Sequence, residues 1–234
     1  MSLKQRWNQA CAETIDTPLF WKIAVDHLSI KRSLGPLIER HARGFVLDAG
    51  AGRLAWRTLL RVRCTRYLAT DYENSHPELG FVADIQGGIP LPDRTFDTIF
   101  CCSVMEHTPE PWRILPEFAR VLADDGRIIL SVPFVYYLHG APHDYFRFTR
   151  HGVERLAAAA GLEVVELQTG GGWAHALGQV FSVVWGGIFW SPKAPWLVTA
   201  PACLYFGVAR LLDGLDRGGL FAQTVNVVLA KPAR

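Results

Sequence analysis

Short apolar runs alternate with longer mixed segments through the first two thirds of the chain. The runs are rich in β-branched and aromatic residues, and the segments between them are long enough for helices that cross over a sheet. This spacing predicts a parallel, doubly wound α/β sheet with helices on both faces. The predicted strands are residues 45–48, 67–70, 96–102 and 127–132, followed by two more at 162–168 and 222–230.

Helical periodicity marks the segments between and before these strands. Residues 111–122 place apolar side chains on one face, and we expect the helix to end at residues 124–126. Thr149 is a suitable N-cap for a helix over 150–160. Residues 1–43 have the pattern of one or two amphipathic helices, broken near Gly35 and Pro36.

The chain divides into three predicted parts. Helices over residues 1–43 precede a sheet domain formed by 44–169 together with 222–231, and residues 170–221 form an apolar insert. A chain of 234 residues with 50% hydrophobic residues buries a substantial core. The net charge of +2 gives no field for non-specific nucleic-acid binding, so we expect no nucleic-acid partner.

Cysteine usage and the N-terminus indicate the compartment. The five cysteines include no C-x-x-C pair, which argues against both a disulfide framework and a zinc knuckle. The first residues lack the apolar segment of a secretory signal. We therefore expect reduced thiols and a cytoplasmic protein.

A glycine turn follows the first strand and is flanked by two carboxylates. Asp48 ends the strand and leads into Gly50 and Gly52, while Asp71 follows the second strand. With Ala55, the turn also satisfies the dinucleotide-binding fingerprint. However, two like charges about 4 Å apart repel by roughly 4 kcal/mol at an effective dielectric near 20. Asp48 therefore favours an ammonium or sulfonium ligand over a pyrophosphate. The alternative for Asp48 is a helix-capping acid, and the alternative for Asp71 is a plain turn residue.

Four blocks in order resemble the class I S-adenosylmethionine-dependent methyltransferases, in particular their type 11-like branch. They are VLDAGAGR, YLATDYE, the segment from VADIQGG to VMEHTPEP, and FARVLADDGRIILSVPF. The resemblance covers residues 44–169 and 222–231. It implies a Rossmann-like, mostly parallel seven-stranded sheet with an antiparallel last strand, and S-adenosylmethionine as cofactor.

The resemblance also implies which residues bind the cofactor. The turn after the first strand holds the methionine end, the acid of the second strand binds the ribose, the third block contacts adenine, and the end of the fourth strand lies beneath the methionine. Leu54 stands where many members have a third glycine, and residues 124–126 replace their Pro-Gly-Gly. The implied set is Asp48, Ala49, Gly50, Gly52, Asp71, Tyr72, Asp84, Ile85, Cys102 and Ser103.

Candidates for handling the acceptor lie after the fourth and fifth strands. His107 follows the fourth strand at the carboxyl edge of the sheet, where open α/β sheets bind ligands. His143 and Tyr145 lie in the loop LHGAPHDYFRFT, which contains a His-Asp-Tyr-Phe-Arg-Phe-Thr string similar to one in that branch. We expect these three residues to contact the acceptor or remove its proton. The alternatives are a hydrogen-bonded loop histidine and a loop fixed by an Asp144–Arg147 pair.

No metal site is predicted. His139 and His143 have a spacing that could bind a metal on a helix, but Gly140 and Pro142 argue against a helix there.

The insert is unusually apolar. Residues 167–192 and 194–209 contain no Lys, Arg, Asp or Glu, which predicts a helical hairpin that turns at Ser191-Pro192-Lys193. Tryptophans near the ends resemble interfacial anchors, although the helices barely reach the length of a membrane span. Two interpretations remain open: contact with a membrane surface or lipid through residues 173–212, or a lid or homodimer interface. Either favours a hydrophobic or lipid-linked acceptor.

The sequence therefore predicts a methyltransferase acting on oxygen or nitrogen of a small-molecule acceptor. An NAD-dependent oxidoreductase and a non-catalytic, membrane-associated scaffold are the alternatives.

Overall fold

The computed structural model describes residues 1–15, 17–216 and 218–233. The chain forms two compact units. The sheet unit comprises Leu34–Pro133, Leu138–Gln168 and Val225–Arg234, and the helical unit comprises Met1–Ser33, Phe134–Tyr137 and Thr169–Thr224. The division into three parts that the sequence suggests stays a prediction.

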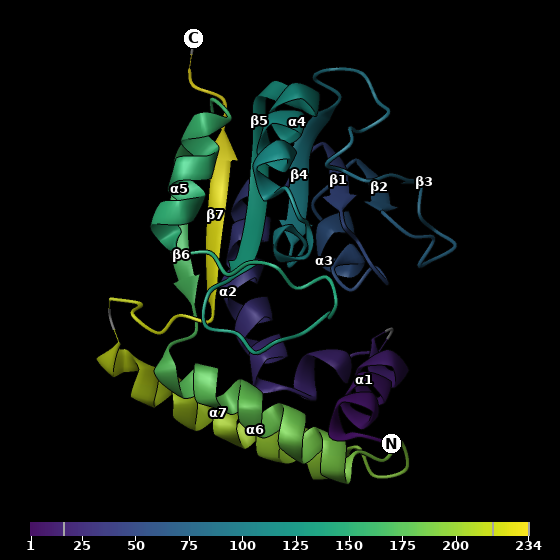
Figure 1. Ribbon diagram of the computed structural model, residues 1–234, viewed down its shortest axis with the longest axis vertical. Coiled ribbons are helices and arrows are strands. Elements are labelled where there is room, and N and C mark those ends of the chain that lie inside the picture. Colours follow the sequence, from purple (N-terminus) through teal and green to yellow (C-terminus); the bar gives the residue numbers. More distant parts are fainter. Residues whose placement is uncertain (16, 217, 234) are drawn as a thin grey trace. The chain divides into compact units, whose positions relative to one another are not determined.

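The sheet unit is built on seven strands in the order β3-β2-β1-β4-β5-β7-β6 (Figure 1). The pairs β1/β2, β1/β4, β2/β3 and β4/β5 are parallel. The arrow of β7 points opposite to those of β5 and β6 in Figure 1, as expected for an antiparallel last strand. The strands are β1 (Phe45–Ala49), β2 (Arg66–Asp71), β3 (Phe81–Val82), β4 (Phe96–Cys102), β5 (Leu122–Pro133), β6 (Glu163–Gly170) and β7 (Thr224–Ala230).

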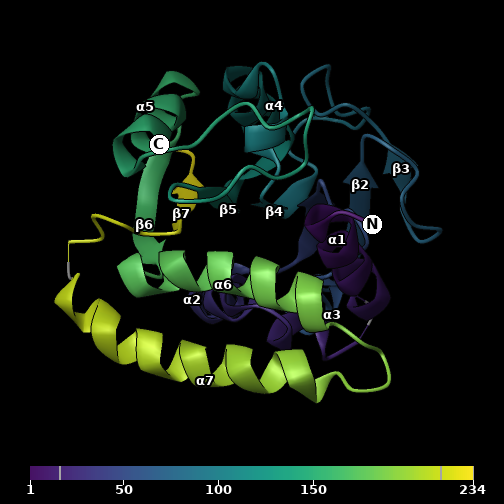
Figure 2. The ribbon, with the colours of Figure 1, turned by 60° about the horizontal axis from the view of Figure 1, so that its bottom comes forward.

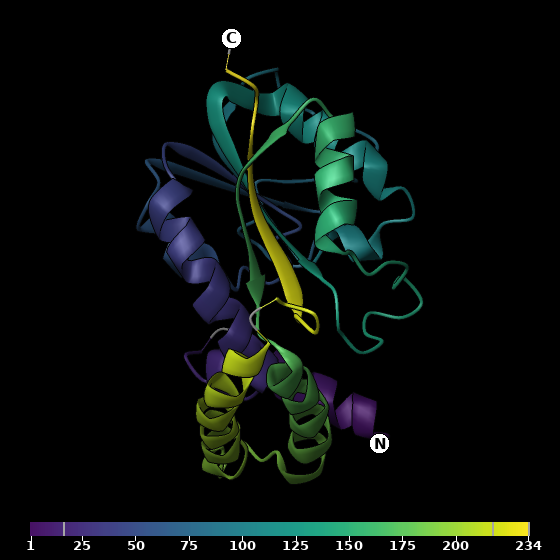
Figure 3. The same cartoon turned by 90° about the vertical axis from the view of Figure 1, so that its left-hand side faces the viewer.

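Helices cover both faces of the sheet, which confirms the doubly wound α/β prediction. Figure 3 shows α4 (Ile114–Val121) and α5 (Arg150–Ala159) on one face and the C-terminal part of α2 (Val25–His41) on the other. The short helix α3 (Arg57–Arg61) follows the glycine turn. Thr149 caps α5 as predicted, since its hydroxyl accepts the Gly152 amide at 3.1 Å.

The core of the sheet unit lies between the central strands and the helices. Phe96, Ile99 and Phe100 of β4 are fully buried, and α4 buries four apolar side chains on its inner face. At about 25 cal/mol per Å² of apolar surface, each such side chain contributes roughly 1.5–3 kcal/mol to folding. The 3.6-residue pattern of α4 therefore fixes which face packs on the sheet.

Two boundaries differ from the predictions. α2 runs through Gly35 and Pro36 without a break. Fully buried Leu34 and Leu37 hold this part of the helix against the core, which offsets the hydrogen bond that proline cannot make. The predicted helix end at 124–126 is also wrong, because β5 already begins at Leu122. Leu122 pairs with Phe96 and the register then shifts, so those residues form an irregularity within the strand.

The helical unit contains α1 (Leu3–Thr14), α6 (Trp173–Phe189) and α7 (Trp196–Leu212), with short 3-10 turns at Phe20–Lys22 and Asp213–Leu215. Two more 3-10 turns, at Met105–His107 and Pro111–Arg113, belong to the sheet unit. α6 and α7 run side by side as the predicted hairpin (Figure 2). A Cβ on Gly186 would meet the Trp7 ring at 2.6 Å, so this glycine allows α1 to approach α6 closely. Trp7 lies in a core with Ala10, Ile23, Ala24 and Val198.

The hairpin tryptophans have partners inside the helical unit. The Trp190 indole donates to Glu13 at 2.7 Å, and the Trp185 indole donates to the Leu197 carbonyl at 2.8 Å. Trp196 is 64% exposed. Trp196–Leu215 is long and apolar enough to cross a membrane by length and composition alone, and 17% of its most apolar window is buried.

Candidate functional site

The predicted site lies where the strand order reverses. β1 and β4 are neighbours in the centre of the sheet, and the chain moves outward from them in opposite directions. Open α/β sheets bind ligands beyond the carboxyl ends of the strands at such a switch point. β1 ends at Ala49 and β4 at Cys102, so the glycine turn and the segment leading to His107 both begin at this edge (Figure 1).

The glycine turn depends on backbone conformations that favour glycine. Gly50 has φ +74° and Gly52 has φ +52°. The amide of Gly50 donates to the Thr70 carbonyl at 2.9 Å, which ties the turn to β2. A Cβ on Gly50 would lie 2.2 Å from Val104 Cγ2, whereas a Cβ on Gly52 would meet nothing within 4 Å. Gly50 is thus required for packing, while Gly52 leaves its side of the backbone open.

Leu54 keeps the turn in shape without the third glycine. It adopts φ +61°, the left-handed conformation that glycine adopts readily, and its side chain is 5% exposed. A left-handed backbone costs an L-residue roughly 1–2 kcal/mol, and burial of a leucine side chain supplies about 1.5–3 kcal/mol. A leucine in place of the third glycine is therefore compatible with the conformation of this loop.

Asp71 connects the end of β2 to the turn. One carboxylate oxygen, Oδ2, accepts the Gly52 amide at 2.7 Å, and the other accepts the Tyr72 amide at 2.8 Å. Asp71 is 9% exposed, while Tyr72 is 64% exposed. The carboxylate therefore holds the turn at the same edge where it is predicted to bind a ligand hydroxyl.

Asp48 is buried within the sheet. Its Oδ2 accepts the Tyr67 hydroxyl at 2.7 Å, and the residue is 2% exposed. Burial raises the pKa of Asp48 to about 7, a change that the Tyr67 hydrogen bond opposes and the Asp71 charge reinforces. A cation bound nearby would stabilise the charged form.

The remaining predicted cofactor residues lie on neighbouring segments. Asp84 is exposed in the loop after β3 and accepts the Gln86 amide at 2.9 Å, and Ile85 beside it is buried. Ser103 has φ +56° and its amide donates to the Ser131 carbonyl at 2.9 Å. Burial raises the pKa of the Cys102 thiol to about 12, so this thiol is protonated at neutral pH.

The loop after β5 is bound to the end of β4 by backbone contacts. The amide of Tyr145 donates to the Glu106 carbonyl at 2.8 Å, and His107 Nδ1 lies 2.5 Å from the His143 carbonyl oxygen. The same loop brings His139 Nε2 to 3.7 Å from Glu106 Oε1. His107 and His139 meet edge to face, with ring centroids 4.7 Å apart.

His143 and Tyr145 form a second, more exposed pair. His143 Nδ1 lies 2.9 Å from the Tyr145 hydroxyl, and Tyr145 is 46% exposed. His107 is half-buried beside Glu106. The three predicted acceptor residues therefore fall into two groups. His107 lies beside the Glu106 carboxylate, whereas His143 and Tyr145 form an exposed pair.

The Asp144–Arg147 pair is present. Arg147 donates to Asp144 Oδ1 at 2.6 Å and to Oδ2 at 3.0 Å, and Asp144 also accepts the His139 amide at 2.7 Å. The guanidinium first, and then the His139 amide and charge, lower the pKa of Asp144 to about 2 despite partial burial. The pair fixes the loop that carries His139 and His143.

Replacing Arg147 by alanine is expected to lower the free energy of unfolding by about 1.5–3 kcal/mol at neutral pH, because the carboxylate of Asp144 would lose both hydrogen bonds from the guanidinium and retain the one from the His139 amide. Chemical denaturation followed by circular dichroism measures this. Arg150→Ala, an exposed arginine three residues along the chain, is the matched control and should change stability by less than about 0.5 kcal/mol. Equal losses in the two variants would contradict the role of the pair.

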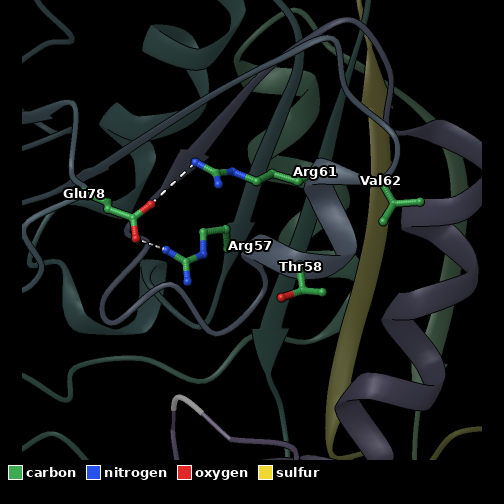
Figure 4. A pocket seen from close by; sticks show the side chains of 5 residues that line it. All are labelled: Arg57, Thr58, Arg61, Val62 and Glu78. Carbon is green, nitrogen blue, oxygen red and sulfur yellow. Dashed lines mark hydrogen bonds and ion pairs between the residues drawn. The ribbon is translucent and has the colours of Figure 1, made fainter.

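A separate recess lies on the surface of the sheet unit. Figure 4 shows Arg57 and Arg61 directed toward Glu78, with Thr58 and Val62 beside them. Arg57 pairs with one oxygen of Glu78, and Arg61 lies 3.5 Å from the other. None of the predicted cofactor residues lines this recess, in which both arginines share the single carboxylate of Glu78.

Glu106 and His139 are not among the acceptor residues predicted from the sequence, where His139 enters only through its spacing from His143. The structure brings Glu106, His107 and His139 together. The available signal was the position of Glu106 at the carboxyl end of a central strand, where a buried carboxylate needs a partner.

The chain is similar in sequence to a methyltransferase family model and to bacterial proteins named as probable or uncharacterized methyltransferases. Residues 47–130 match the family model described as a methyltransferase domain. A "Probable S-adenosylmethionine-dependent methyltransferase" of Mycobacterium tuberculosis is 28% identical over 96 residues, which is 38% of this chain and 35% of the relative. An uncharacterized methyltransferase of a Mycobacterium species is 27% identical over 159 residues, 58% of this chain and 63% of the relative. The chain thus spans about a third of the length of the first relative.

Solved structures share the fold. The cyclase SpnF superposes with a TM-score of 0.60 at 14% identity, over 86% of this chain and 82% of that one. The 1,6-didemethyltoxoflavin-N1-methyltransferase of Burkholderia thailandensis, solved with bound 1,6-didemethyltoxoflavin and S-adenosylhomocysteine, superposes with a TM-score of 0.53 at 19% identity, over 92% and 82% of the two chains. At these identities the likeness shows the fold.

Proposed function

Because this chain belongs to the class I S-adenosylmethionine-dependent methyltransferases, we propose that it transfers a methyl group from S-adenosylmethionine to an oxygen or nitrogen of a small acceptor. The carboxylate-flanked glycine turn at the switch point of the sheet is the observation that carries this proposal. S-adenosylmethionine supplies a methyl group activated by a positively charged sulfur. The protein then has to bind and orient the donor and the acceptor, and to exclude water from the site.

The residues present fit this donor. The open backbone face at Gly52 admits a ligand close to the turn, and the buried carboxylate of Asp48 suits a cationic amino-acid moiety. Asp71 would bind the ribose hydroxyls. Ala49 and Gly50 would complete the turn around the methionine end, and Tyr72, Asp84, Ile85, Cys102 and Ser103 would complete the set.

Three residues are proposed to handle the acceptor. The contact of His107 Nδ1 with the His143 carbonyl requires the proton on Nδ1, which leaves a lone pair on Nε2, 3.8 Å from Glu106 Oε1. His143, paired with the Tyr145 hydroxyl, is exposed and is proposed to take up the acceptor proton. General base catalysis of this kind contributes about 10²- to 10⁴-fold to a rate.

We further propose that the acceptor is hydrophobic or lipid-linked and that the α6–α7 hairpin contacts lipid. The support is the exposure of apolar side chains in this hairpin, including Leu204 at 72% and Leu211 at 81%. Exposed apolar surface of this kind marks contacts with lipid or protein. All five cysteines are free thiols, which supports a cytoplasmic enzyme.

The test uses S-adenosylmethionine labelled in its methyl group, incubated with the protein and with separated lipid and aqueous fractions of a cell extract. Label entering a lipid-fraction product supports the proposal. A water-soluble acceptor methylated equally well without lipid or detergent contradicts the lipid-linked assignment but leaves methyl transfer in place.

Titration with nucleotides separates the rival functions. The proposal expects saturable binding of S-adenosylhomocysteine, whereas an oxidoreductase expects binding of NAD alone and a scaffold expects neither. The likeness to a cyclase gives the labelling experiment particular weight, because the fold also supports other chemistry.

Affinity for S-adenosylhomocysteine is expected to fall about tenfold per pH unit as the pH drops below about 7, the pKa to which burial raises Asp48. The ligand ammonium favours the carboxylate, so binding at lower pH must release a proton. Isothermal titration from pH 5.5 to 8.5 measures this. Asp48→Asn should bind more weakly and without the slope, and a slope unchanged in this variant would contradict the assignment.

The raised pKa of Asp48 affects the stability of the ligand-free protein in the opposite direction, since stability falls as the pH rises. A raised carboxylate pKa stabilises the ligand-free fold below the unfolded value of 3.8, and this contribution is lost as pH rises through about 7. Ligand-free wild-type protein should therefore lose stability between pH 5 and 8 relative to Asp48→Asn.

A further inference from the structure

Glu106 is a buried carboxylate without a hydrogen-bond partner. It is fully buried, and neither carboxylate oxygen has a hydrogen bond within the part of the chain that the structure describes. An isolated buried carboxylate is costly unless a cation compensates it. Glu106 Oε1 faces His107 Nε2 at 3.8 Å and His139 Nε2 at 3.7 Å, both beyond hydrogen-bond length.

The surroundings of both histidines direct Nε2 toward this carboxylate. His107 Nδ1 is held by the His143 carbonyl oxygen at 2.5 Å, which assigns the proton to Nδ1. His139 Nδ1 faces Asp144 Oδ2 at 3.6 Å, and Arg147 fixes Asp144. Carbonyl and carboxylate partners behind the imidazole are typical of metal-binding histidines, because they set the tautomer and the ring orientation.

The three side chains can bind one ion. Their ligand atoms all lie within 4.8 Å of one another, and ligands on a tetrahedral ion at about 2.1 Å are roughly 3.4 Å apart. Small side-chain adjustments therefore close the site around a metal. Two histidines and one carboxylate suit Zn²⁺, Co²⁺ or Fe²⁺ and leave at least one coordination position open.

We propose that Glu106, His107 and His139 bind a divalent transition-metal ion at the carboxyl end of β4. The ion compensates the buried charge of Glu106 and occupies the space between the oxygen and the two Nε2 atoms. This departs from the expectation of no metal, which considered only the pair His139 and His143. The structure places those two in an irregular loop and gives His139 a different partner.

The metal site also indicates which kind of acceptor the protein methylates, an inference that rests on the proposed function. An open position on the ion would bind an acceptor hydroxyl and lower its pKa, so that its oxygen attacks the methyl carbon as the anion. The new O–C bond would form as the C–S bond of S-adenosylmethionine breaks, and S-adenosylhomocysteine would leave. His107 would then contact the acceptor through the ion, and the proton would pass to His143 or water. An acceptor with a metal-binding hydroxyl is therefore favoured over an amine.

The test measures binding of Co²⁺ to untagged, metal-stripped protein by isothermal titration and by its visible absorption. One ion per chain is expected, displaced by Zn²⁺. Glu106→Gln and His139→Ala should each lower the affinity at least 100-fold. His151→Ala, which removes an exposed histidine that contacts Glu154 outside the cluster, should change it less than twofold.

Absence of stoichiometric Co²⁺ binding by the wild-type protein, or equal binding by folded Glu106→Gln and wild type, would overturn the site. Circular dichroism and binding of S-adenosylhomocysteine show whether each variant is folded. Metal binding with methyl transfer that survives chelation would overturn the acceptor step alone. Metal binding without any binding of S-adenosylhomocysteine would overturn the proposed function and leave the site standing.

Discussion

Replacing Asp71 by alanine is expected to reduce the affinity for S-adenosylhomocysteine by at least 100-fold. The variant loses the carboxylate predicted to bind the ribose and also the bond at 2.7 Å that holds the Gly52 amide. Each hydrogen bond to a charged group contributes about 1.5–3 kcal/mol, and 1.4 kcal/mol corresponds to a factor of ten. Isothermal titration calorimetry of the purified protein measures the change.

Two further variants sharpen this result. Asp71→Asn keeps an oxygen acceptor without the charge and should lose about tenfold. Asp93→Ala removes an aspartate that pairs with Arg120 outside the site and should bind within twofold of wild type. Wild-type affinity in folded Asp71→Ala would remove Asp71 from the cofactor site.

Replacing Gly50 by alanine is expected to destabilise the protein by about 2–5 kcal/mol. The left-handed backbone costs roughly 1–2 kcal/mol for an L-residue, and the overpacking adds about 1–3 kcal/mol. The new Cβ would lie 2.2 Å from Cγ2 of Val104, a branched side chain with few alternative rotamers. Denaturation monitored by circular dichroism gives the free-energy difference.

Gly52→Ala is the matched control because it shares the positive φ but has open space around the new methyl group. It should lose only the backbone contribution, about 1–2 kcal/mol. Combining Gly50→Ala with Val104→Ala should recover part of the loss by removing the obstructing methyl groups. A Gly50→Ala variant no less stable than Gly52→Ala would show that the turn tolerates a side chain there.

Local sequence patterns were sufficient to predict most of the strands and helices of the sheet unit. The strands at 45–48 and 96–102 and the Thr149 cap depend on nearby residues, and the structure confirms them. The break expected at Pro36 was wrong because burial of the surrounding helix outweighs a local propensity. The short strand β3, at Phe81–Val82, was not predicted because its pairing with β2 is tertiary.

The candidate site was predictable only where its residues are contiguous. The glycine turn and Asp71 follow strands that the pattern located, so their common edge could be inferred. Glu106 lies in the 3-10 turn after β4 and His139 in the loop after β5, and no spacing rule indicates that they meet. Their contact depends on the hydrogen bonds that hold the loop after β5 to the Glu106 carbonyl, which only the folded chain provides.

The left-handed Leu54 has a consequence for recognising related chains. A search that demands a third glycine in this turn tests for one residue type, whereas the fold requires a torsion angle that a well-packed leucine also supplies. Homologues with bulky residues at this position can therefore retain the complete nucleoside-binding loop. Ancestry in such cases is better judged from backbone geometry than from counting glycines.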